Sequence, residues 1–293
     1  MDVYPTEPPP EDDPLRRHPK VLVTPHLGAS TKEAQEAVSV DAAIAAVTYL
    51  RGEGIKGAVN VTGLRVDLDP QQQAFVNLAS RMAIILSPMI TRGIANVEIE
   101  LSGKNLSAAS GAVERAALVG LLRKYLDMPL NLINVKSAAE SRGIKLRTLC
   151  CEEAPAGGPQ LSLIVRGPEG SVDEGTHPAD QVRRIVGRVF DDPKPRIVEI
   201  NGYHMDMVPA GDMMLIQNED RPGMIGLVGS AFGEAGVNIA DMSISRRDGK
   251  DGQMTALMVL KIDTEAPESL INQLQARPGI LKVAAVKLPG DDT

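Results

Sequence analysis

A loop near the carboxyl end of the chain combines residue types that suit the recognition of an amino acid. It reads Asn218-Glu219-Asp220-Arg221-Pro222-Gly223 and leads into a segment with helical periodicity. Backbone N–H groups at the start of a helix attract a carboxylate. Asp220 can pair with an ammonium group, and the side-chain amides of Asn218 and Asn238 can donate and accept hydrogen bonds. These side chains are therefore candidates for holding an amino-acid effector.

The same residues also have a purely structural interpretation. Asp220 suits the cap of the helix that follows, Pro222 suits its first turn, and Asn238 is typical of a turn. The residue types alone leave the two interpretations open.

His26 is a second candidate for chemistry, because the ordinary pKa of histidine lies close to neutrality. It follows the apolar segment Val21-Leu22-Val23, which predicts a short buried strand that needs neighbouring strands. An imidazole at the end of such a strand can transfer a proton during catalysis. A lone histidine after a strand is, however, usually structural.

A set of arginines in the middle of the chain raises the question of an anion site. The set comprises Arg183, Arg184, Arg188 and Arg196. Guanidinium groups bind phosphate through paired hydrogen bonds. On a strand, Arg184 and Arg188 share one face and Arg183 lies on the other, so convergence needs a bulge. A solvated charged face is the favoured interpretation, and an anion site stays open.

The segments around the carboxyl-terminal loop predict a ferredoxin-like βαββαβ domain. Strands are predicted at 213–217, 239–245, 254–262 and about 280–288. Helices are predicted to begin at Arg221 and at Pro267, and Gly236 suits the residue that follows the first helix. In this arrangement both helices cover one face of an antiparallel sheet.

The residues before this domain predict a helix and then an α/β domain. Ser30-Thr31-Lys32-Glu33 predicts a capping box, with Ser30 as the cap of a helix that ends near Gly52. The apolar face of that helix is Ala37, Val40, Ile44 and Val47. A helical stripe follows at Phe75, Leu78, Ala79, Met82, Ile85 and Leu86. Alternation predicts a strand at 97–101, a helix is predicted at 107–127, and extended segments at 144–151, 160–166, 182–190 and 195–200.

The composition excludes several classes of protein. A net charge of -7 and an aromatic content of 2% argue against a nucleic-acid partner. The only cysteines, Cys150 and Cys151, are adjacent, which predicts neither a disulfide framework nor a metal site, and at least one is expected to be buried. No apolar segment is long enough to span a membrane. These features together favour a reducing, cytoplasmic compartment.

Two strings near the carboxyl end resemble the ACT domain of long-form D-3-phosphoglycerate dehydrogenases. They are Ile216 to Gly226, and Gly236-Val237-Asn238-Ile239. The resemblance implies that paired ACT domains bind L-serine as an inhibitor. The ligand positions of the family fall on Asn218, Asp220 and Asn238, with Asn218 where some members have His or Tyr. Ile200 to Asp206 resembles the preceding intervening domain, which in some members binds an anionic effector or substrate.

The amino-terminal strings also resemble this family. Asp2-Val3-Tyr4-Pro5-Thr6-Glu7-Pro8-Pro9 and Val23 to Thr31 look like the closing segment of its nucleotide-binding domain. The resemblance implies that His26 is the acid/base of hydride transfer with NAD, and that Asp2 lies in a segment facing the cofactor. No G-x-G-x-x-G string opens a helix after a strand. The family's catalytic Arg and the Glu that orients its His are expected upstream, without a match here. The isolated chain is therefore expected to be inactive and to bind no cofactor.

The resemblance covers nearly the whole chain and implies a division into three parts. These are a remnant of a Rossmann-type nucleotide-binding domain with a crossing helix (1–55), an α/β intervening domain (56–209) and a ferredoxin-like ACT domain (210–293). The implied function is the C-terminal regulatory part of an NAD-dependent D-3-phosphoglycerate dehydrogenase, assembled as a homo-oligomer. Two alternatives remain: a stand-alone ACT-type regulatory protein, and a shortened gene product whose reading frame extends upstream. A third, a different hydroxyacid dehydrogenase, is less favoured because most short relatives lack both trailing domains.

Overall fold

The computed structural model describes residues 1–50, 67–91, 93–126, 128–168, 182–190, 194–248 and 252–290. The chain divides into two compact units, Met1–Thr62 and Gly63–Thr293. The predicted domain boundary at 55/56 falls outside the described residues. Within the described residues, no helix is both long and apolar enough to cross a membrane.

The first unit contains one helix, α1 (Lys32–Leu50), in its described part. Its cap is Thr31 and not Ser30 as predicted, because the Thr31 Oγ1 accepts a hydrogen bond from the Ala34 N–H at 3.1 Å. The predicted apolar face exists as a stripe, but no residue of α1 is buried. Ile44, for example, remains 48% exposed. The periodicity therefore predicted the helix correctly, whereas its packing partner is not among the described residues of this unit.

The expected strand at Val21–Val23 is wrong. These residues lie outside any described strand, and Leu22 is 82% exposed. The segment contacts the first residues of the chain through single hydrogen bonds, including Thr24 N–H to the Met1 carbonyl at 3.0 Å. One short neighbour does not satisfy a strand whose two edges both need partners.

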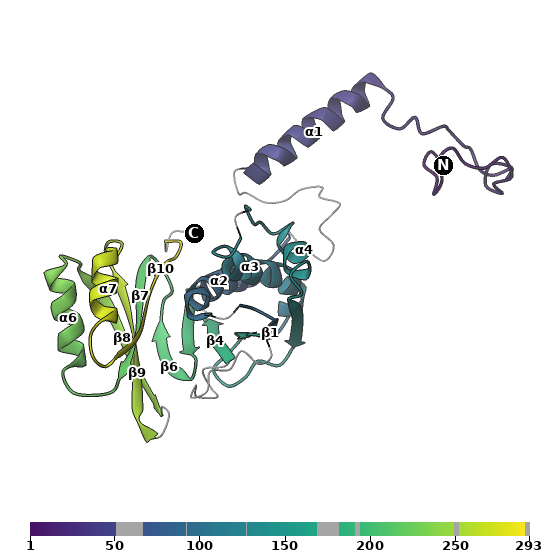
Figure 1. Ribbon diagram of the computed structural model, residues 1–293. Coiled ribbons are helices and arrows are strands. Elements are labelled where there is room, and N and C mark those ends of the chain that lie inside the picture. Colours follow the sequence, from purple (N-terminus) through teal and green to yellow (C-terminus); the bar gives the residue numbers. More distant parts are fainter. Residues whose placement is uncertain are drawn as a thin grey trace. The chain divides into compact units, whose positions relative to one another are not determined.

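The first half of the second unit is built on a six-stranded sheet in the order β2-β1-β3-β4-β5-β6. Its strands are β1 (Asn96–Ser102), β2 (Lys145–Cys151), β3 (Gln160–Arg166), β4 (Val182–Val189), β5 (Pro195–Ile200) and β6 (Tyr203–Met207). Strands β1 and β2 are parallel, and the other neighbours are antiparallel. Its helical segments are α2 (Pro70–Leu86), η1 (Ser87–Met89), η2 (Leu106–Ala109), α3 (Ser110–Leu122) and α4 (Val135–Glu140). Helices α2 and α3 lie side by side against the sheet (Figure 1).

The predicted apolar stripe of α2 is confirmed as the centre of this core. Phe75, Leu78 and Met82 have no exposed surface. Asp69 caps the helix in a capping box with Gln72, so the helix begins directly after a loop. The remaining predicted segments of this domain are also confirmed, but α4 and β6 were not predicted. Both are short, with 6 and 5 residues, which leaves too few repeats to show a period.

The second half of the second unit has the predicted ferredoxin-like order. Its elements are β7 (Asp212–Glu219), α6 (Met224–Glu234), β8 (Ile239–Asp248), β9 (Met254–Ile262), α7 (Glu268–Gln275) and β10 (Ile280–Lys287). The four strands pair in the order β10-β7-β9-β8, all antiparallel. Figure 1 shows α6 and α7 on the same face of this sheet. Gly236 takes the predicted place after α6, with φ of +69°.

Alternate residues of β7 enter two different cores. Met214 and Ile216 pack with α6 and α7, whereas Met213 and Leu215 join the core built around α2. One face of the second half's sheet therefore packs on its own helices, and the other face joins the core around α2. Arg81 on α2 reinforces the junction, because its guanidinium donates to the carbonyls of Pro209, Pro289 and Gly290.

Cys150 and Cys151 are both exposed on β2, contrary to the expectation that one is buried. Strand β2 lies at the edge of the six-stranded sheet, so it is covered less than an inner strand.

Candidate functional site

The carboxyl-terminal loop borders a cavity of about 360 Å³ between the start of α6 and strand β8. The polar side chains around it come from the end of β7, from the loop and from β8. They are Asn218, Asp220, Arg221 and Arg246. Apolar contributions come from Ile225 and Ile244. The cavity therefore combines an acid, an amide, two guanidinium groups and the amino-terminal end of a helix.

Asn218 is the most buried polar residue at this cavity, with 1% of its surface exposed. Its Nδ2 donates to the Glu219 carbonyl at 2.6 Å. Its Oδ1 accepts no hydrogen bond from the described residues. A buried acceptor without a donor is unfavourable, so this oxygen is suited to a donor that arrives with a ligand.

Asp220 does not cap α6, and the helix begins at Met224 rather than at Arg221, so Pro222 precedes it and does not lie in its first turn. That structural interpretation is wrong. The cap position is Gly223, with φ of +90° and no side-chain hydrogen bond to the helix. The Asp220 carboxylate instead faces the cavity, where its Oδ2 lies 3.3 Å from the Nε of Arg246. The Asp220 carboxylate therefore pairs with the guanidinium of Arg246 on β8. It is also placed to pair with the cation of a ligand in the cavity.

Asn238 lies at the opposite end of α6 from the other two predicted residues. The helix has 11 residues, which corresponds to a length of about 16 Å. The Asn238 Nδ2 donates to the Asp263 Oδ2 at 2.7 Å, and the residue does not line the cavity. A single chain thus brings Asn218 and Asp220 together and leaves Asn238 apart.

Arg246 was not predicted from the sequence. Its side chain is 68% exposed, and its strand neighbour Ile244 also faces the cavity. The period of two along β8 puts these residues on one face, which is a signal that the sequence contains. What the sequence lacks is the register that sets β8 beside the loop.

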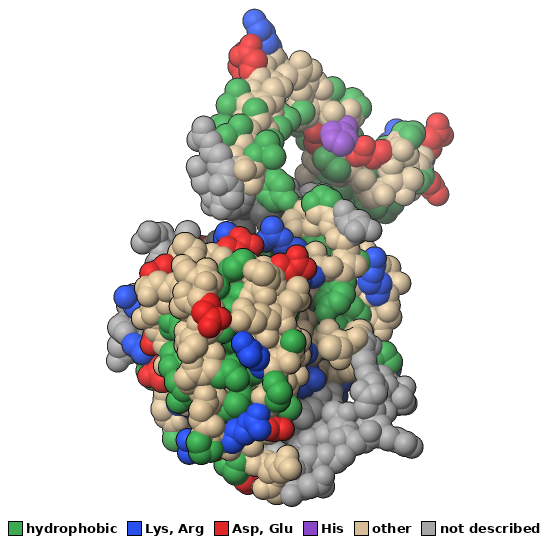
Figure 2. Space-filling model, turned by 60° about the vertical axis from the view of Figure 1, so that its left-hand side comes forward, with side chains coloured by type: hydrophobic (Ala, Val, Ile, Leu, Met, Phe, Trp, Pro, Cys, Tyr) green, Lys and Arg blue, Asp and Glu red, His purple; other side chains and the backbone are tan. Residues whose placement is uncertain are grey.

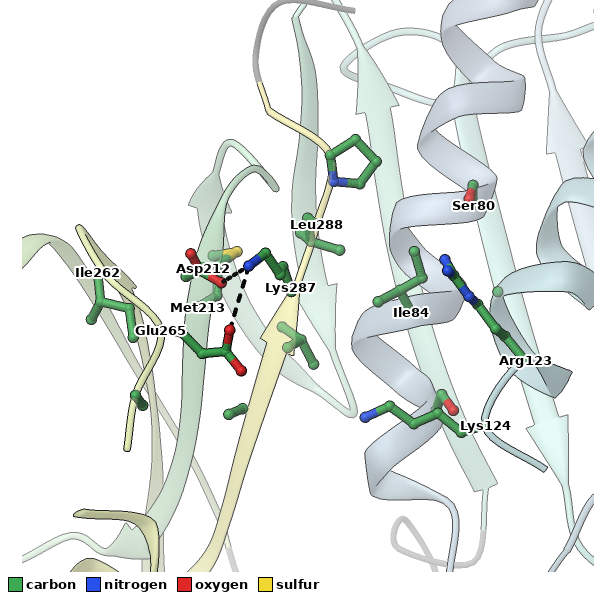
Figure 3. Close-up of a pocket in the computed structure, with 16 residues that line it drawn as sticks. Ser80, Ile84, Arg123, Lys124, Asp212, Met213, Ile262, Glu265, Lys287 and Leu288 are labelled. Carbon is green, nitrogen blue, oxygen red and sulfur yellow. Dashed lines mark hydrogen bonds and ion pairs between the residues drawn. The ribbon is translucent and has the colours of Figure 1, made fainter. Parts of the chain in front are cut away.

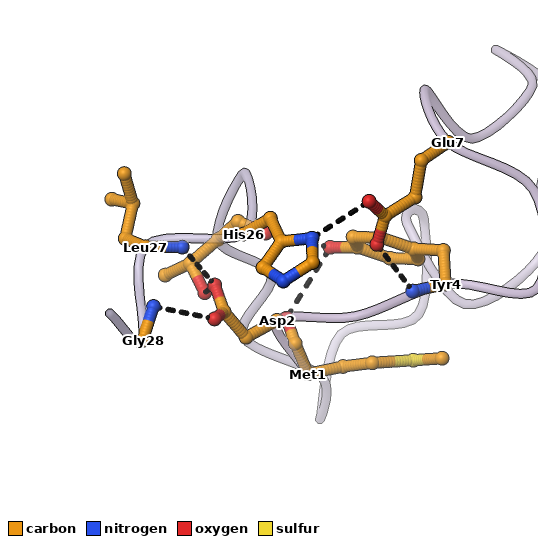
Figure 4. A network of polar contacts seen from close by, with 8 residues as sticks. Met1, Asp2, Tyr4, Glu7, His26, Leu27 and Gly28 are labelled. Carbon is orange, nitrogen blue, oxygen red and sulfur yellow. Dashed lines mark hydrogen bonds and ion pairs between the residues drawn. The ribbon is translucent and has the colours of Figure 1, made fainter. Parts of the chain in front are cut away.

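The amino-terminal unit holds a second polar cluster around His26 (Figure 4). The Nδ1 of His26 lies 2.7 Å from the Oε2 of Glu7. Hydrogen bonding to this carboxylate, together with its charge, raises the pKa of His26 above its ordinary value. The same hydrogen bond, with one from the Tyr4 N–H, lowers the pKa of Glu7. With Nδ1 occupied, Nε2 has no partner in the described part of the chain.

Asp2 fastens the loop that carries His26. Its Oδ1 accepts hydrogen bonds from the Thr24 Oγ1 at 2.6 Å and from the Leu27 N–H at 2.7 Å. Its Oδ2 accepts from the Gly28 N–H at 2.7 Å. These bonds, led by the one from Thr24, lower the pKa of Asp2. They span His26 on both sides and hold it at a φ of +56°, a conformation that few residues other than glycine adopt.

The expectation that His26 has no carboxylate to orient it in this chain is wrong, because Glu7 contacts its Nδ1. Figure 2 shows histidine at the surface of this segment among acidic side chains. The sequence does show that Glu7 lies in the same acidic, proline-rich segment as Asp2. Only the folded structure shows that its carboxylate reaches the imidazole of His26.

The described residues supply no cradle for a dinucleotide. The one G-x-G-x-x-G string of the sequence is Gly52-Glu53-Gly54-Ile55-Lys56-Gly57. It follows helix α1 rather than a strand, and it lies outside the described residues. Around His26, the described groups fit proton transfer but do not fit the binding of NAD.

The four arginines of the possible anion site each have a different partner. Arg184 pairs with Glu199 at 2.7 Å, and Arg188 donates to the Gln160 Oε1. Arg196 pairs with Asp206, and Arg183 donates to the Met89 carbonyl. Strand β4 does contain the irregularity that convergence needs, between Val186 and Gly187. The side chains nevertheless engage separate neighbours, which supports the interpretation as a charged face.

A larger cavity of about 700 Å³ lies where the two halves of the second unit meet (Figure 3). Arg123 and Lys124 extend toward it from the residues after α3. On the opposite wall Lys287 pairs with Glu265 at 3.4 Å and with Asp212 at 4.0 Å. Both signs of charge line this cavity with apolar residues, so it does not select one class of ligand.

The βαββαβ order and the loop cavity define a domain of the ACT class, joined to an α/β domain. Residues 71–201 match the D-3-phosphoglycerate dehydrogenase intervening domain, and residues 213–279 match the ACT domain. With both domains in this order, the chain belongs to the D-3-phosphoglycerate dehydrogenase family.

Curated relatives agree along the whole chain. D-3-phosphoglycerate dehydrogenase from Bacillus subtilis is 29% identical over 99% of this chain and 52% of its own length. The proteins of that name from Archaeoglobus fulgidus and Methanocaldococcus jannaschii are each 31% identical over 98% of this chain and 52% of their own length. The chain spans about half the length of the curated relatives it matches.

Proposed function

We propose that this chain is the C-terminal regulatory part of an NAD-dependent D-3-phosphoglycerate dehydrogenase, and that its ACT domain binds an amino-acid effector, L-serine. The reaction of the intact enzyme is the oxidation of 3-phosphoglycerate to 3-phosphohydroxypyruvate, which opens serine biosynthesis. The match to the family and the cavity at Asn218 and Asp220 support the proposal.

One observation carries the effector site. The Oδ1 of Asn218 is buried, has no donor among the described residues, and belongs to a residue that lines the cavity together with Asp220. The ammonium group of an amino acid supplies donors to both groups, and the amino-terminal amides of α6 favour its carboxylate. A zwitterion therefore matches the cavity better than an anion or a cation alone.

The effector site needs a second copy of the chain if Asn238 takes part. Asn238 lies at the far end of α6, and β8 is an edge strand of the sheet. Met242 and Ile244 on β8 are 38% and 37% exposed. An open edge with apolar side chains favours association with a like strand. Such pairing of two ACT domains makes a homo-oligomer and lets Asn238 of one copy approach the cavity of the other.

The role proposed for His26 is proton transfer to and from the substrate hydroxyl. Glu7 holds Nδ1, which leaves Nε2 to exchange the proton. NAD supplies the hydride chemistry in the intact enzyme. Because the described residues form no cradle for it, we expect the isolated chain to show no dehydrogenase turnover.

Calorimetry with L-serine tests the effector site on the full chain. We expect saturable heat with the wild type and a loss of at least tenfold in affinity for Asp220→Ala, because an ionic hydrogen bond is removed. Glu268→Ala, which removes an exposed acid at the start of α7, is the matched control. Equal affinities for the wild type and Asp220→Ala would exclude this site.

The second candidate is a stand-alone ACT-type regulatory protein. It is favoured because the ACT cavity and the His26 cluster belong to different units of the chain. Turnover by the chain with NAD and D-3-phosphoglycerate would exclude the stand-alone role. Serine binding by a chain that never acquires turnover, even when extended by upstream coding sequence, would favour the stand-alone role.

A further inference from the structure

We infer that the amino-acid effector binds between Asp220 and Arg246 and replaces their ion pair, so that Arg246 pairs with the ligand's carboxylate. This inference deepens the proposed function and rests on it. It adds a ligand-binding residue from β8 to those expected in the loop, and it defines the ligand class as compounds with both a free ammonium and a free carboxylate.

The ion pair is positioned for such an exchange. The Nε of Arg246 lies 3.3 Å from the Oδ2 of Asp220, and both residues line the cavity. In the described part of the chain, neither side chain makes another hydrogen bond or ion pair. The Nη groups of the guanidinium are therefore available, and they match a carboxylate in a fork geometry.

Opening the pair costs little. Arg246 is 68% exposed, and Asp220 is 23% exposed. Ion pairs in contact with water contribute little net stability, and the long arginine stem can move aside. Arg221, the other guanidinium at the cavity, is held instead by the Pro278 carbonyl and by Glu219. Of the two arginines at this cavity, Arg246 is thus the one whose side chain can move to pair with a ligand.

Insertion of a zwitterion leaves every charge with an opposite neighbour. The ligand's ammonium replaces the guanidinium beside Asp220. The ligand's carboxylate then pairs with the displaced guanidinium of Arg246. The buried Oδ1 of Asn218 gives the ammonium a further acceptor beside the acid. A ligand lacking the carboxylate displaces Arg246 and leaves it without an anion. A ligand lacking the ammonium meets Asp220 with like charge.

The test compares three probes on the full chain by calorimetry: L-serine, L-serinamide, which lacks the carboxylate, and L-glycerate, which lacks the ammonium. We expect Arg246→Gln to weaken L-serine by about tenfold or more. L-serinamide is expected to bind this variant at least as tightly as the wild type, because no guanidinium has to be displaced from Asp220. Arg246→Lys, which keeps the charge without the fork, is expected to lie between. Arg123→Gln, an exposed arginine away from the loop, serves as the control.

The outcomes separate this inference from the proposed function. Unchanged binding of L-serine to Arg246→Gln, or an equal loss for L-serine and L-serinamide, would overturn the role of Arg246 while the effector site stands. Absence of L-serine binding to the wild type would remove the effector site itself. Because Arg246 is mostly exposed, the variant is expected to keep the thermal midpoint of the wild type.

Discussion

Glu7 and His26 lie 19 residues apart in the sequence, and their side chains meet at 2.7 Å. The contact joins a carboxylate to Nδ1 and leaves the other ring nitrogen, Nε2, without a partner in the described part of the chain. It is made within the amino-terminal unit, between the acidic, proline-rich segment and the loop that Asp2 fastens. This contact between a carboxylate and an imidazole is therefore made entirely within the amino-terminal unit.

Glu7→Gln is expected to return the pKa of His26 toward its ordinary value of 6.5. NMR titration of the imidazole protons measures this shift directly. Glu11→Gln, an exposed acid in the same segment, is the control. An unchanged His26 pKa in Glu7→Gln would show that the two side chains do not interact in solution.

The same pair predicts how stability depends on pH. The raised pKa of His26 gives a contribution that is present below 6.5 and lost as pH rises through the folded pKa. The lowered pKa of Glu7 gives a contribution that is present above 4.5 and lost as pH falls through the folded pKa. The contribution of the pair is therefore greatest between these values. Glu7→Gln is expected to flatten the pH profile of unfolding in this unit.

Asp2→Asn tests how the His26 loop is held. The substituted side chain has one acceptor oxygen for three donors, so the Leu27 or Gly28 N–H loses its partner. We expect these amides to exchange hydrogen about threefold to tenfold faster. Asp12→Asn is the control for the change of charge. Protection that is equal in the wild type and Asp2→Asn would contradict the anchoring role.

Arg81→Met tests the junction between the halves of the second unit. Arg81 is 5% exposed and donates to three backbone carbonyls. Its loss is expected to lower the free energy of unfolding by about 2–4 kcal/mol, measured from denaturant midpoints. Arg123→Met removes an exposed arginine and is expected to change the value by less than about 0.5 kcal/mol. Similar effects of both variants would show that the junction does not depend on Arg81.

Two glycine substitutions in helices are expected to have opposite signs. A Cβ on Gly120 in α3 would meet the Ala83 Cβ at 2.7 Å and the Ser80 carbonyl at 2.8 Å. Gly120→Ala is therefore expected to lose about 1–2 kcal/mol of stability despite its better helix propensity. Gly229 in α6 has open space, so Gly229→Ala is expected to gain up to about 1 kcal/mol. Stabilisation by both substitutions would contradict the close approach of α2 and α3.

Much of the fold could be predicted because local sequence patterns indicate its helices and strands. The stripe of α2 and the alternation of β1 follow from burial on one face, and both are confirmed. Helix α4 and strand β6 escaped prediction because each is too short to repeat a period. The segment at Val21–Val23 has the composition of a strand, but no strand pairs with it in the described part of the chain.

The amino-acid sequence by itself determined the order of elements in the ACT domain and the loop with Asn218 and Asp220, since turn residues and apolar periodicity act over short distances. Only the tertiary structure decided that Glu7 reaches His26, that Arg246 faces Asp220, and that Asn238 lies at the far end of α6. The contact of Glu7 with His26 depends on loops that Asp2 ties together, whereas the other two depend on strand register and on the length of a helix. Register and distance arise when separate segments pack, and residue types alone do not specify them.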